Sequence, residues 1–306
     1  MKYPKKLSKG DTIGLVAPSS FVPKERELKC KEVIESLGYS VKMSDNISDN
    51  YGGFMAGDGK TRGMWINKMF ADPDVDAIFC VRGGDGGSRA MSYIDVDIVK
   101  SNPKIFVGYS DITSMHLLFN QKCNLVTFHG PMVSSNMIDD YDEQTAKSLK
   151  DAINADEYYE FKNTNGFDIE VLKDGMAEAP IVGGNLSLLS ASIGTPYEIQ
   201  PKGKILFIEE VGEDVPRLER YAYHLKDAGK YDGVAGIILG QFADCGNEVM
   251  PEYTPVKDFE DILKDIKVPI MYNIQSGHDT PMMTIPLGAV CKMDTSSRSI
   301  KFKVER

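Results

Sequence analysis

Short apolar runs that alternate with amphipathic stretches constrain the fold of this chain more than any other feature. Residues 12–17 are apolar and rich in β-branched side chains, and they end at Pro18, which predicts a buried strand. Residues 25–37 carry apolar side chains at helical spacing and stop at Gly38, and residues 40–43 predict a second strand. A strand, a helix and a strand in this order predict an α/β fold with a parallel sheet.

The same alternation continues along the chain. Further strands are predicted at 77–81, 124–128, 204–208, 235–240, 268–273, 288–293 and 299–304. Residues 157–179 are polar and mixed, without a clear period. For a length of 306 residues we therefore expect two domains, 1–155 and 180–306, joined by a linker at 156–179.

Composition excludes several classes of protein. The net charge is −10 and the basic residues are scattered, which argues against a nucleic-acid partner. No apolar run approaches the length of a membrane span, and the early run is too short for a signal peptide, so we expect a cytoplasmic protein. Five cysteines without a C-x-x-C pair predict reduced thiols, no disulfide framework and no zinc site.

The stretch 104–113 is the strongest candidate for a site. A β-branched apolar run ends in Gly108-Tyr109-Ser110-Asp111, and an amphipathic run follows, which predicts a strand, a tight turn and a helix. At such a turn the Ser110 hydroxyl would stand beside free N–H groups of the helix start, which can hold an oxyanion. Ile112 occupies the place of the second glycine of a G-x-S-x-G elbow, so an ordinary helix cap stays open as the alternative.

A glycine-rich loop follows the strand predicted at 77–81. Four glycines within residues 83–87, bracketed by Arg82 and Arg89, would let backbone N–H groups approach a ligand, and the arginines could bind a carboxylate. A purely structural turn is the alternative. Gly59-Lys60-Thr61 is similar to the end of a P-loop, but Phe54 stands where the motif requires glycine. Residues 46–59 are expected to form a long functional or mobile loop.

Two further candidates follow apolar strands in the second half. Glu209 comes directly after four apolar residues, so we expect a partly buried carboxylate that needs a partner. Glu210 is interpreted instead as a solvated acid near a helix start. His278 lies in a loop after a strand, where a general base could sit. Serine, histidine and acid would act as nucleophile, base and orienting group.

The other three histidines are weaker candidates. His129 ends a strand beside Gly-Pro and could lie near a site, whereas His116 and His224 are interpreted as structural or exposed residues. A helix cap or a salt bridge stays open as the alternative role of Glu209.

Nearly the whole chain resembles the LD-carboxypeptidases, serine peptidases whose relatives include the microcin-immunity peptidases. The motifs that carry the resemblance are Gly10-Asp11-Thr12-Ile13, Ala17-Pro18-Ser19, Ala56-Gly57, Arg82-Gly83-Gly84, residues 103–113, His129-Gly130-Pro131, Gly183-Gly184-Asn185, residues 206–210 and Gly277-His278. The resemblance implies a Ser-His-Glu triad at Ser110, His278 and Glu209, and an oxyanion hole at the N–H groups of Gly84 and Asp111.

The resemblance also implies a fold and a reaction. The expected fold is a Rossmann- or flavodoxin-like N-terminal domain with a parallel sheet, plus a smaller C-terminal α/β domain. The expected reaction removes D-alanine from murein tetrapeptide by cutting an L,D bond in peptidoglycan recycling, without a metal or cofactor, in a homodimer. Arg82 is expected to bind the terminal carboxylate. Asp85 replaces the aromatic residue common in the family and is expected to alter substrate contacts.

Two other functions stay open at this point. A microcin-type peptidase would act on aminoacyl-sulfamoyl adenylates, and a non-catalytic peptide-binding protein would keep the fold without the chemistry.

Overall fold

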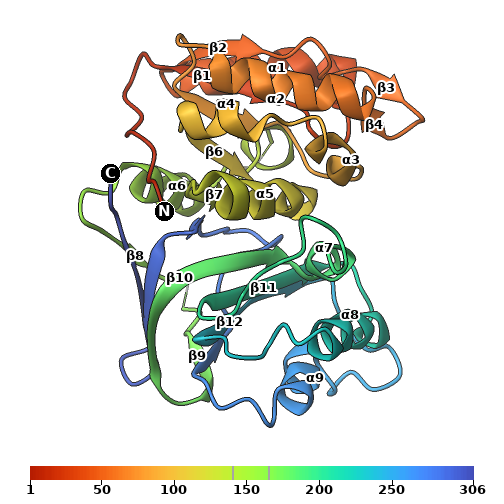
Figure 1. The fold of residues 1–306 in the computed structure, drawn as a ribbon, viewed down its shortest axis with the longest axis vertical. Coiled ribbons are helices and arrows are strands. Elements are labelled where there is room, and N and C mark those ends of the chain that lie inside the picture. Colours follow the sequence, from red (N-terminus) through yellow and green to blue (C-terminus); the bar gives the residue numbers. More distant parts are fainter. Residues whose placement is uncertain (140, 165) are drawn as a thin grey trace.

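A computed structural model describes residues 1–139, 141–164 and 166–306, arranged as two stacked α/β halves (Figure 1). The upper half in this view is built on a six-stranded sheet with the order β14-β7-β6-β5-β1-β2. Its parallel strands are β1 (Thr12–Val16), β2 (Ser40–Met43), β5 (Ala77–Cys80), β6 (Ile105–Gly108) and β7 (Thr127–His129). Strands β5 and β6 are buried at every position, as expected for strands that are covered on both faces.

Helices cover both faces of this sheet. The elements on one face are α2 (Gly59–Ala71), α4 (Val96–Ser101) and α5 (Thr113–Cys123). The elements on the other face are α1 (Lys24–Ser36), the π-helical turn η2 (Val133–Met137) and α6 (Glu143–Asn154). The short helix α3 (Gly87–Met91) follows the glycine-rich loop. This arrangement confirms the doubly wound α/β fold expected for the first half.

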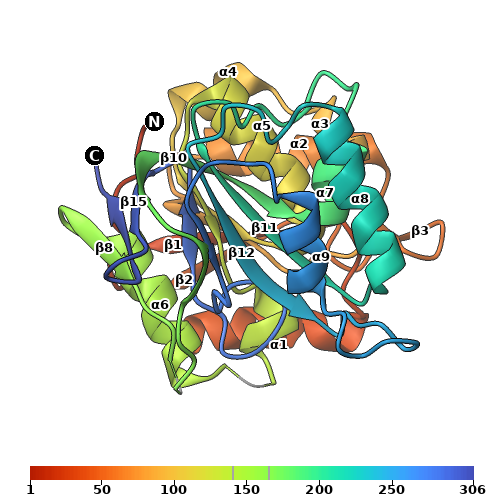
Figure 2. The same cartoon turned by 90° about the horizontal axis from the view of Figure 1, so that it is seen from below.

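The lower half contains an eight-stranded mixed sheet with the order β8-β16-β15-β10-β11-β12-β13-β9. Its parallel strands are β10 (Met176–Asn185), β11 (Ile205–Val211), β12 (Gly236–Ala243) and β13 (Ile270–Tyr272). Its helices are α7 (Leu186–Ala191), α8 (Val215–Asp227) and α9 (Pro255–Ile262). Figure 2 shows α8 and α9 beside β11 and β12, with β8 and β15 toward the opposite side.

The stretch 156–179, expected as a linker, is instead part of the second sheet. It contains β8 (Tyr158–Phe161), β9 (Glu170–Lys173) and the start of β10, and β8 and β9 form the two edges of that sheet. In β8 exposed and buried residues alternate, because only one face of an edge strand meets the core. Half of its side chains therefore face solvent and are polar or aromatic, so the sequence of this segment has no continuous apolar run that would predict a strand.

The last part of the chain links the two halves. Strand β14 (Ile285–Leu287) leaves the second half and pairs antiparallel with β7 at the edge of the first sheet. The chain then returns to the second sheet through β15 (Val290–Asp294) and β16 (Ser299–Lys303). One hydrophobic cluster joins Val107 and Phe128 of the first sheet to Phe207 and Phe302 of the second. The two sheets consequently share a core.

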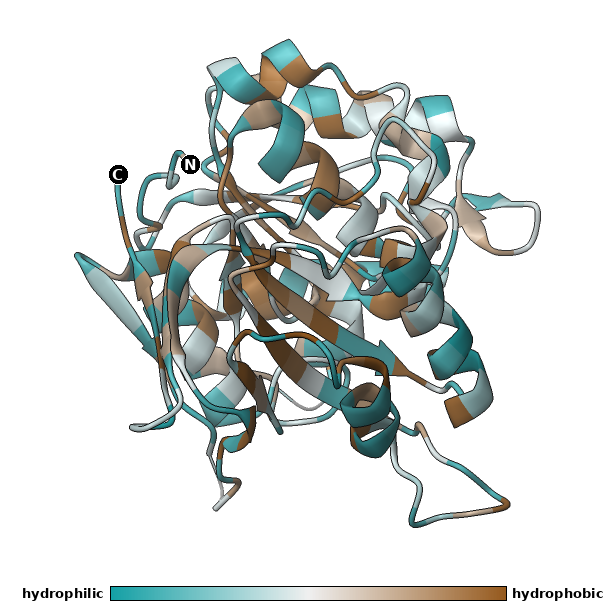
Figure 3. Ribbon diagram, turned by 60° about the horizontal axis from the view of Figure 1, so that its bottom comes forward, coloured by the Kyte–Doolittle hydropathy of each residue, from teal (hydrophilic) through white to brown (hydrophobic). Residues whose placement is uncertain are grey.

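Apolar residues gather along the central strands of both sheets, and hydrophilic residues cover much of the helices (Figure 3). None of the described helices combines the length and apolar composition that crossing a bilayer requires. The loop at 46–59 contains a small hairpin of β3 (Asn50–Tyr51) and β4 (Met55–Ala56), which the sequence pattern did not predict.

Candidate active site

Ser110 lies at a strained turn directly after β6. Its φ of +63° is in the left-handed region, which residues other than glycine seldom adopt. The turn Ser110–Ile112 is a single 3₁₀ turn that leads into α5. A side chain on Gly108 would lie 2.9 Å from Cγ2 of Ile112, so Ile112 packs over this glycine. Backbone strain of this kind is concentrated at functional sites, which favours the site interpretation over an ordinary cap.

The glycine-rich loop lies against this serine. A Cβ atom on Gly83 would be 2.9 Å from Cβ of Ser110. Gly84 has a φ of +103°, and a Cβ atom there would fall 2.2 Å from Oγ of Ser20. The N–H of Ser20 donates to the carbonyl of Gly83 at 3.1 Å, and Oγ of Ser20 accepts from the N–H of Asp85 at 3.1 Å.

The peptide between Gly83 and Gly84 is therefore held from its carbonyl side. Its N–H, that of Gly84, has no hydrogen-bond acceptor among the residues that the structure describes. The N–H of Asp111 is at the start of the helical turn, where the first donors of a helix lack internal acceptors. The predicted oxyanion hole requires two such backbone donors near one serine.

Glu209 and His278 form a buried acid–base pair. Nδ1 of His278 lies 2.7 Å from Oε2 of Glu209, and the Glu209 side chain is fully buried. The pairing of β11 with β12 shifts register between Ile208 and Glu210, an irregularity that can re-aim a side chain. A Cβ atom on Gly277 would approach Oε2 of Glu209 to 3.2 Å, so glycine gives the histidine loop room beside the carboxylate.

The pKa of His278 lies above its ordinary value. Burial is the largest single effect and favours the neutral ring, but the neighbouring carboxylates together outweigh it, chiefly through the charge of Glu209 and its hydrogen bond to the ring. Glu210 and Asp279 add smaller contributions in the same direction. The neighbouring carboxylates thus stabilise an imidazolium at this position.

The structure brings this pair next to the serine turn. The rings of His278 and Tyr109 are 4.7 Å apart between centroids, and Tyr109 immediately precedes Ser110. Nε2 of His278 is buried and has no hydrogen-bond partner in the described part of the chain, so it makes no hydrogen bond to Oγ of Ser110. Such bonds are often long in free enzymes and tighten when substrate binds.

One contact between the halves positions the two sides of the site. Oγ1 of Thr113, in the first turn of α5, accepts from the N–H of Asn185 at 3.0 Å. Gly184 permits this approach, because a Cβ atom there would fall 2.5 Å from Oγ1 of Thr113. The serine turn and the end of β10 are thereby fixed to each other.

Two predicted substrate contacts lie at the edge of this arrangement. Arg82 is half-buried, and its Nη1 donates to the carbonyl of Phe21 at 3.4 Å. Asp85 is exposed, and its backbone N–H is the group that contacts Ser20. Neither side chain makes a hydrogen bond to Ser110, Glu209 or His278 among the described residues.

Two of the other three histidines are buried in structural environments, whereas His224 is exposed on α8 with its Nδ1 2.9 Å from Oγ of Ser190. His116 is buried between Oγ1 of Thr127 and the carbonyl of Gly108, each at 2.8 Å, and burial lowers its pKa to about 4. His129 is fully buried and 5.9 Å from the Tyr109 ring, and burial lowers its pKa well below the ordinary value. It therefore lies behind the serine turn as a neutral ring.

The interpretation of Glu210 as a solvated acid is wrong. Glu210 is 2% exposed, and its carboxylate accepts from Nδ2 of Asn185 at 2.6 Å and from the N–H groups of Ser187 and Val211. Burial raises its pKa, and these donors oppose that shift. Glu209 and Glu210 are both buried because β11 lies inside the second sheet and is buried at every position from Ile205 to Glu210, as expected for a strand covered on both faces.

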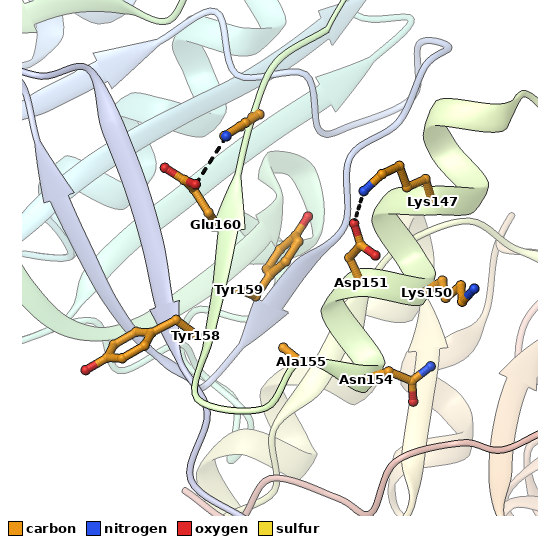
Figure 4. A pocket seen from close by; sticks show the side chains of 9 residues that line it. Lys147, Lys150, Asp151, Asn154, Ala155, Tyr158, Tyr159 and Glu160 are labelled. Carbon is orange, nitrogen blue, oxygen red and sulfur yellow. Dashed lines mark hydrogen bonds and ion pairs between the residues drawn. The ribbon is translucent and has the colours of Figure 1, made fainter.

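Pockets lie beside the acid–base pair and elsewhere. A pocket of about 370 Å³ borders the histidine loop and includes Gln241, Asp279 and Thr280 in its lining. Another of about 440 Å³ lies between α6 and β8 and contains none of the site residues described above. Figure 4 shows this second pocket, with an ion pair between Lys147 and Asp151 on α6 and another between Glu160 on β8 and Lys162.

The described residues contain no group of three or more His, Cys, Asp or Glu arranged to hold a metal ion.

Comparisons with known proteins agree with the two-part architecture. Residues 13–130 match the LD-carboxypeptidase N-terminal domain, and residues 178–293 match the LD-carboxypeptidase C-terminal domain. A solved structure of MccF in complex with glutamyl sulfamoyl guanosine has a TM-score of 0.92 and 23% identity, covering 100% of this chain and 99% of that chain. Muramoyltetrapeptide carboxypeptidase from Oxalobacter formigenes has a TM-score of 0.84 and 24% identity, covering 96% and 99%. These two likenesses concern the fold.

Relatives by sequence cover almost the full length. A protein of Bacillus subtilis (strain 168) named "Probable murein peptide carboxypeptidase" is 36% identical over 307 residues, covering 97% of this chain and 92% of the relative. The "Microcin C7 self-immunity protein MccF" of Escherichia coli is 27% identical over 326 residues, covering 96% and 93%. With both domains matched and a relative above 30% identity along the chain, this protein belongs to the LD-carboxypeptidase family.

Proposed function

We propose that this protein is a serine carboxypeptidase that cuts an L,D-peptide bond and releases the C-terminal D-alanine of a murein tetrapeptide in peptidoglycan recycling. The observation that carries the proposal is the 2.7 Å contact of His278 with Glu209 beside the strained turn at Ser110. Family membership supports a peptidase, and the name of the Bacillus subtilis relative supports a murein peptide as substrate.

The proposed reaction begins with Oγ of Ser110. It attacks the carbonyl carbon that precedes the terminal D-residue, while Nε2 of His278 takes the hydroxyl proton. Glu209 holds the ring with Nδ1–H toward Oε2 and stabilises the imidazolium. The N–H groups of Gly84 and Asp111 hold the oxyanion of the tetrahedral intermediate.

The intermediate then collapses as His278 returns the proton to the amine of the leaving D-alanine. The acyl group stays on Ser110 until a water molecule, deprotonated by His278, attacks the ester carbonyl. The second tetrahedral intermediate collapses as His278 gives this proton to Oγ of Ser110, which breaks the ester bond, frees the second product and restores the serine hydroxyl and the neutral ring. Arg82 is proposed to bind the terminal carboxylate, since its guanidinium lies at the edge of the glycine loop.

Mass-spectrometric detection of D-alanine released from a defined muramoyl tetrapeptide tests this proposal. Replacement Ser110→Ala should lower kcat by about 10⁶-fold, because the nucleophile is lost. Circular dichroism and thermal unfolding should confirm that the variant is folded. Full turnover by a folded Ser110→Ala protein would refute serine catalysis.

A second candidate is a microcin-type peptidase that acts on an aminoacyl-sulfamoyl adenylate. The sequence similarity to MccF along the chain favours it as the alternative. Parallel assays with the tetrapeptide and with an aminoacyl-sulfamoyl adenylate separate the two substrates by their kcat/KM ratio. Labelling of Ser110 by a fluorophosphonate would exclude a purely peptide-binding role. A homodimer is also proposed from the family resemblance, and sedimentation equilibrium at several concentrations tests it.

A further inference from the structure

Arg62 is a buried cation that holds three loops of the site together. It lies on α2 and is 1% exposed. Its Nη1 donates to the carbonyl oxygens of Pro18 at 2.6 Å and Gly86 at 2.7 Å, and its Nε donates to the carbonyl of Gly57 at 3.1 Å. Within the described ranges it makes no ion pair with a carboxylate, although a buried charge normally requires one.

The carboxylate that does most to raise the pKa of Arg62, against the lowering by burial, is the side chain of Asp111. This residue follows Ser110 and is 4% exposed. Its Oδ2 accepts from the N–H of Gly87 at 2.6 Å. Burial raises the pKa of Asp111, and the Gly87 N–H and the charge of Arg62 oppose that shift. The side chain that follows the proposed nucleophile is thus tied to the glycine-rich loop.

Arg62 and Asp111 form hydrogen bonds to the two ends of one peptide group. The carbonyl of Gly86, which Arg62 binds, and the N–H of Gly87, which Asp111 binds, belong to the same peptide bond. We infer that Arg62 and Asp111 are a positioning pair that clamps this peptide and thereby fixes the loop that carries the Gly84 N–H. The inference rests on the proposed serine chemistry, because it assigns the pair a role in oxyanion stabilisation.

A glycine-rich loop needs such a clamp. Gly86 has a φ of +92°, and glycine offers no side chain to restrict the backbone. If the peptide turned over, its carbonyl would face the carboxylate and its N–H would face the guanidinium. Both interactions would then be repulsive, so the two opposite charges select one orientation. A Cβ atom on Gly87 would lie 2.6 Å from Oδ2 of Asp111, so glycine alone permits this close approach.

The same guanidinium also supports the other end of the loop. It binds the carbonyl of Pro18, two residues before Ser20. The N–H of Ser20 in turn binds the carbonyl of Gly83, whose peptide carries the Gly84 N–H. Arg62 therefore fixes the loop both through Gly86 and through the segment that holds Gly83.

Replacement of either charged side chain tests the inference. Arg62→Gln should lower kcat for D-alanine release by about 10²-fold, because a displaced oxyanion donor costs about that factor. Arg62→Lys keeps the charge but not the fork, and should lose less. Asp111→Asn should also lose activity. The loss in Arg62→Lys/Asp111→Asn should be smaller than the product of the two single losses, because both residues act on one peptide.

Arg306→Gln is the matched control. Arg306 also donates to backbone carbonyls, those of Pro4, Ile153 and Ala155, but it lies outside the site. It should lower the midpoint of thermal unfolding and leave kcat unchanged. A structural role for Arg62 would give the same pattern, so the contrast between these two arginines isolates positioning from stability.

A second readout keeps the test independent of folding yield. In the Arg62 variants the affinity of a peptide boronic acid, which forms a tetrahedral adduct with Ser110, should fall in parallel with kcat. The Kd of intact tetrapeptide, measured in a Ser110→Ala background, should stay within twofold. If Arg62→Gln does not fold, Arg62→Lys and Asp111→Asn carry the same comparison.

The outcomes separate this inference from the proposed function. If Ser110→Ala is inactive while folded Arg62→Lys and Asp111→Asn both keep full kcat, the inference is wrong and the serine mechanism stands. If Ser110→Ala keeps full turnover, the serine mechanism is wrong and the inference falls with it. Equal losses in tetrapeptide and boronic acid affinity would also refute positioning of the oxyanion donor.

Discussion

Replacement Glu209→Gln should remove the electrostatic support of the proposed base while preserving its shape. For unit charges about 4 Å apart and an effective dielectric constant of about 20, the lost attraction is about 4 kcal/mol. If all of it stabilises the imidazolium in the transition state, kcat should fall about 10³-fold. The full burial of Glu209 and the 2.7 Å contact justify treating the pair as weakly screened.

The pH dependence should change in a stated direction. A general base acts in its neutral form, so kcat/KM should rise with pH through the pKa of His278 in the free enzyme. Glu209 helps to hold that pKa above its ordinary value, whereas burial lowers it. In Glu209→Gln the burial effect prevails, and the rising limb of the profile should move to lower pH. An NMR titration of the His278 ring should show the same shift.

Glu210→Gln provides a control with the same chemical change at the next residue. Glu210 is also buried, but its carboxylate binds Asn185 and backbone N–H groups and not the histidine. This control should reduce stability and change kcat less than tenfold. If Glu209→Gln and Glu210→Gln behave alike, or if the pH profile of Glu209→Gln does not move, Glu209 does not orient His278.

Three further predictions concern stability and the oxyanion loop. Gly84→Ala should lower kcat about 10²-fold, because its Cβ would lie 2.2 Å from the hydroxyl oxygen of Ser20 and displace the loop that carries the oxyanion donor. Gly53 also has a positive φ but has open space around it, so Gly53→Ala should affect stability alone. His116 stays neutral down to a pKa of about 4, whereas in the unfolded chain it binds a proton below about pH 6.5, so lowering the pH from 6.5 to 5 should cost about 2 kcal/mol from this residue in urea unfolding. His116→Gln should remove that part of the loss and leave the part that comes from His129, whose pKa burial also lowers. Thr113→Val should leave the Asn185 N–H without its acceptor and destabilise the protein by about 1–3 kcal/mol, with Thr113→Ser as the control that restores the midpoint.

Local patterns in the sequence were sufficient for the central strands and for the residues at their ends. The β-branched run before Ser110 and the apolar run before Glu209 are buried throughout, so a polar residue directly after them stands out. The edge strand β8 was missed because it buries only alternate residues and lies among polar segments. Strand β14 was missed because it is three residues long and pairs with a strand more than 150 residues earlier.

The roles of Arg62 and Glu210 depend on contacts that no local pattern contains. Arg62 lies on a helix whose other buried residues are mostly apolar, and its acceptors at Pro18 and Gly86 are 44 and 24 residues away. Glu210 is buried because β11 is a central strand covered on both faces, a feature of its place in the sheet and not of residue type. Long-range backbone acceptors and the place of a strand in its sheet are set by the tertiary fold, so sequence reasoning placed the triad candidates but not their supports.

Because β14 pairs with β7, the first sheet cannot be completed until the C-terminal part of the chain has been synthesised. During synthesis, residues up to 155 leave the ribosome with β7 as an unpaired edge, and the strand that covers it arrives about 130 residues later. An open edge with unpaired backbone groups is a template for association between chains. The first half is therefore most exposed to aggregation before the C-terminal strands emerge, and a fragment that ends at 155 would keep that exposed edge permanently.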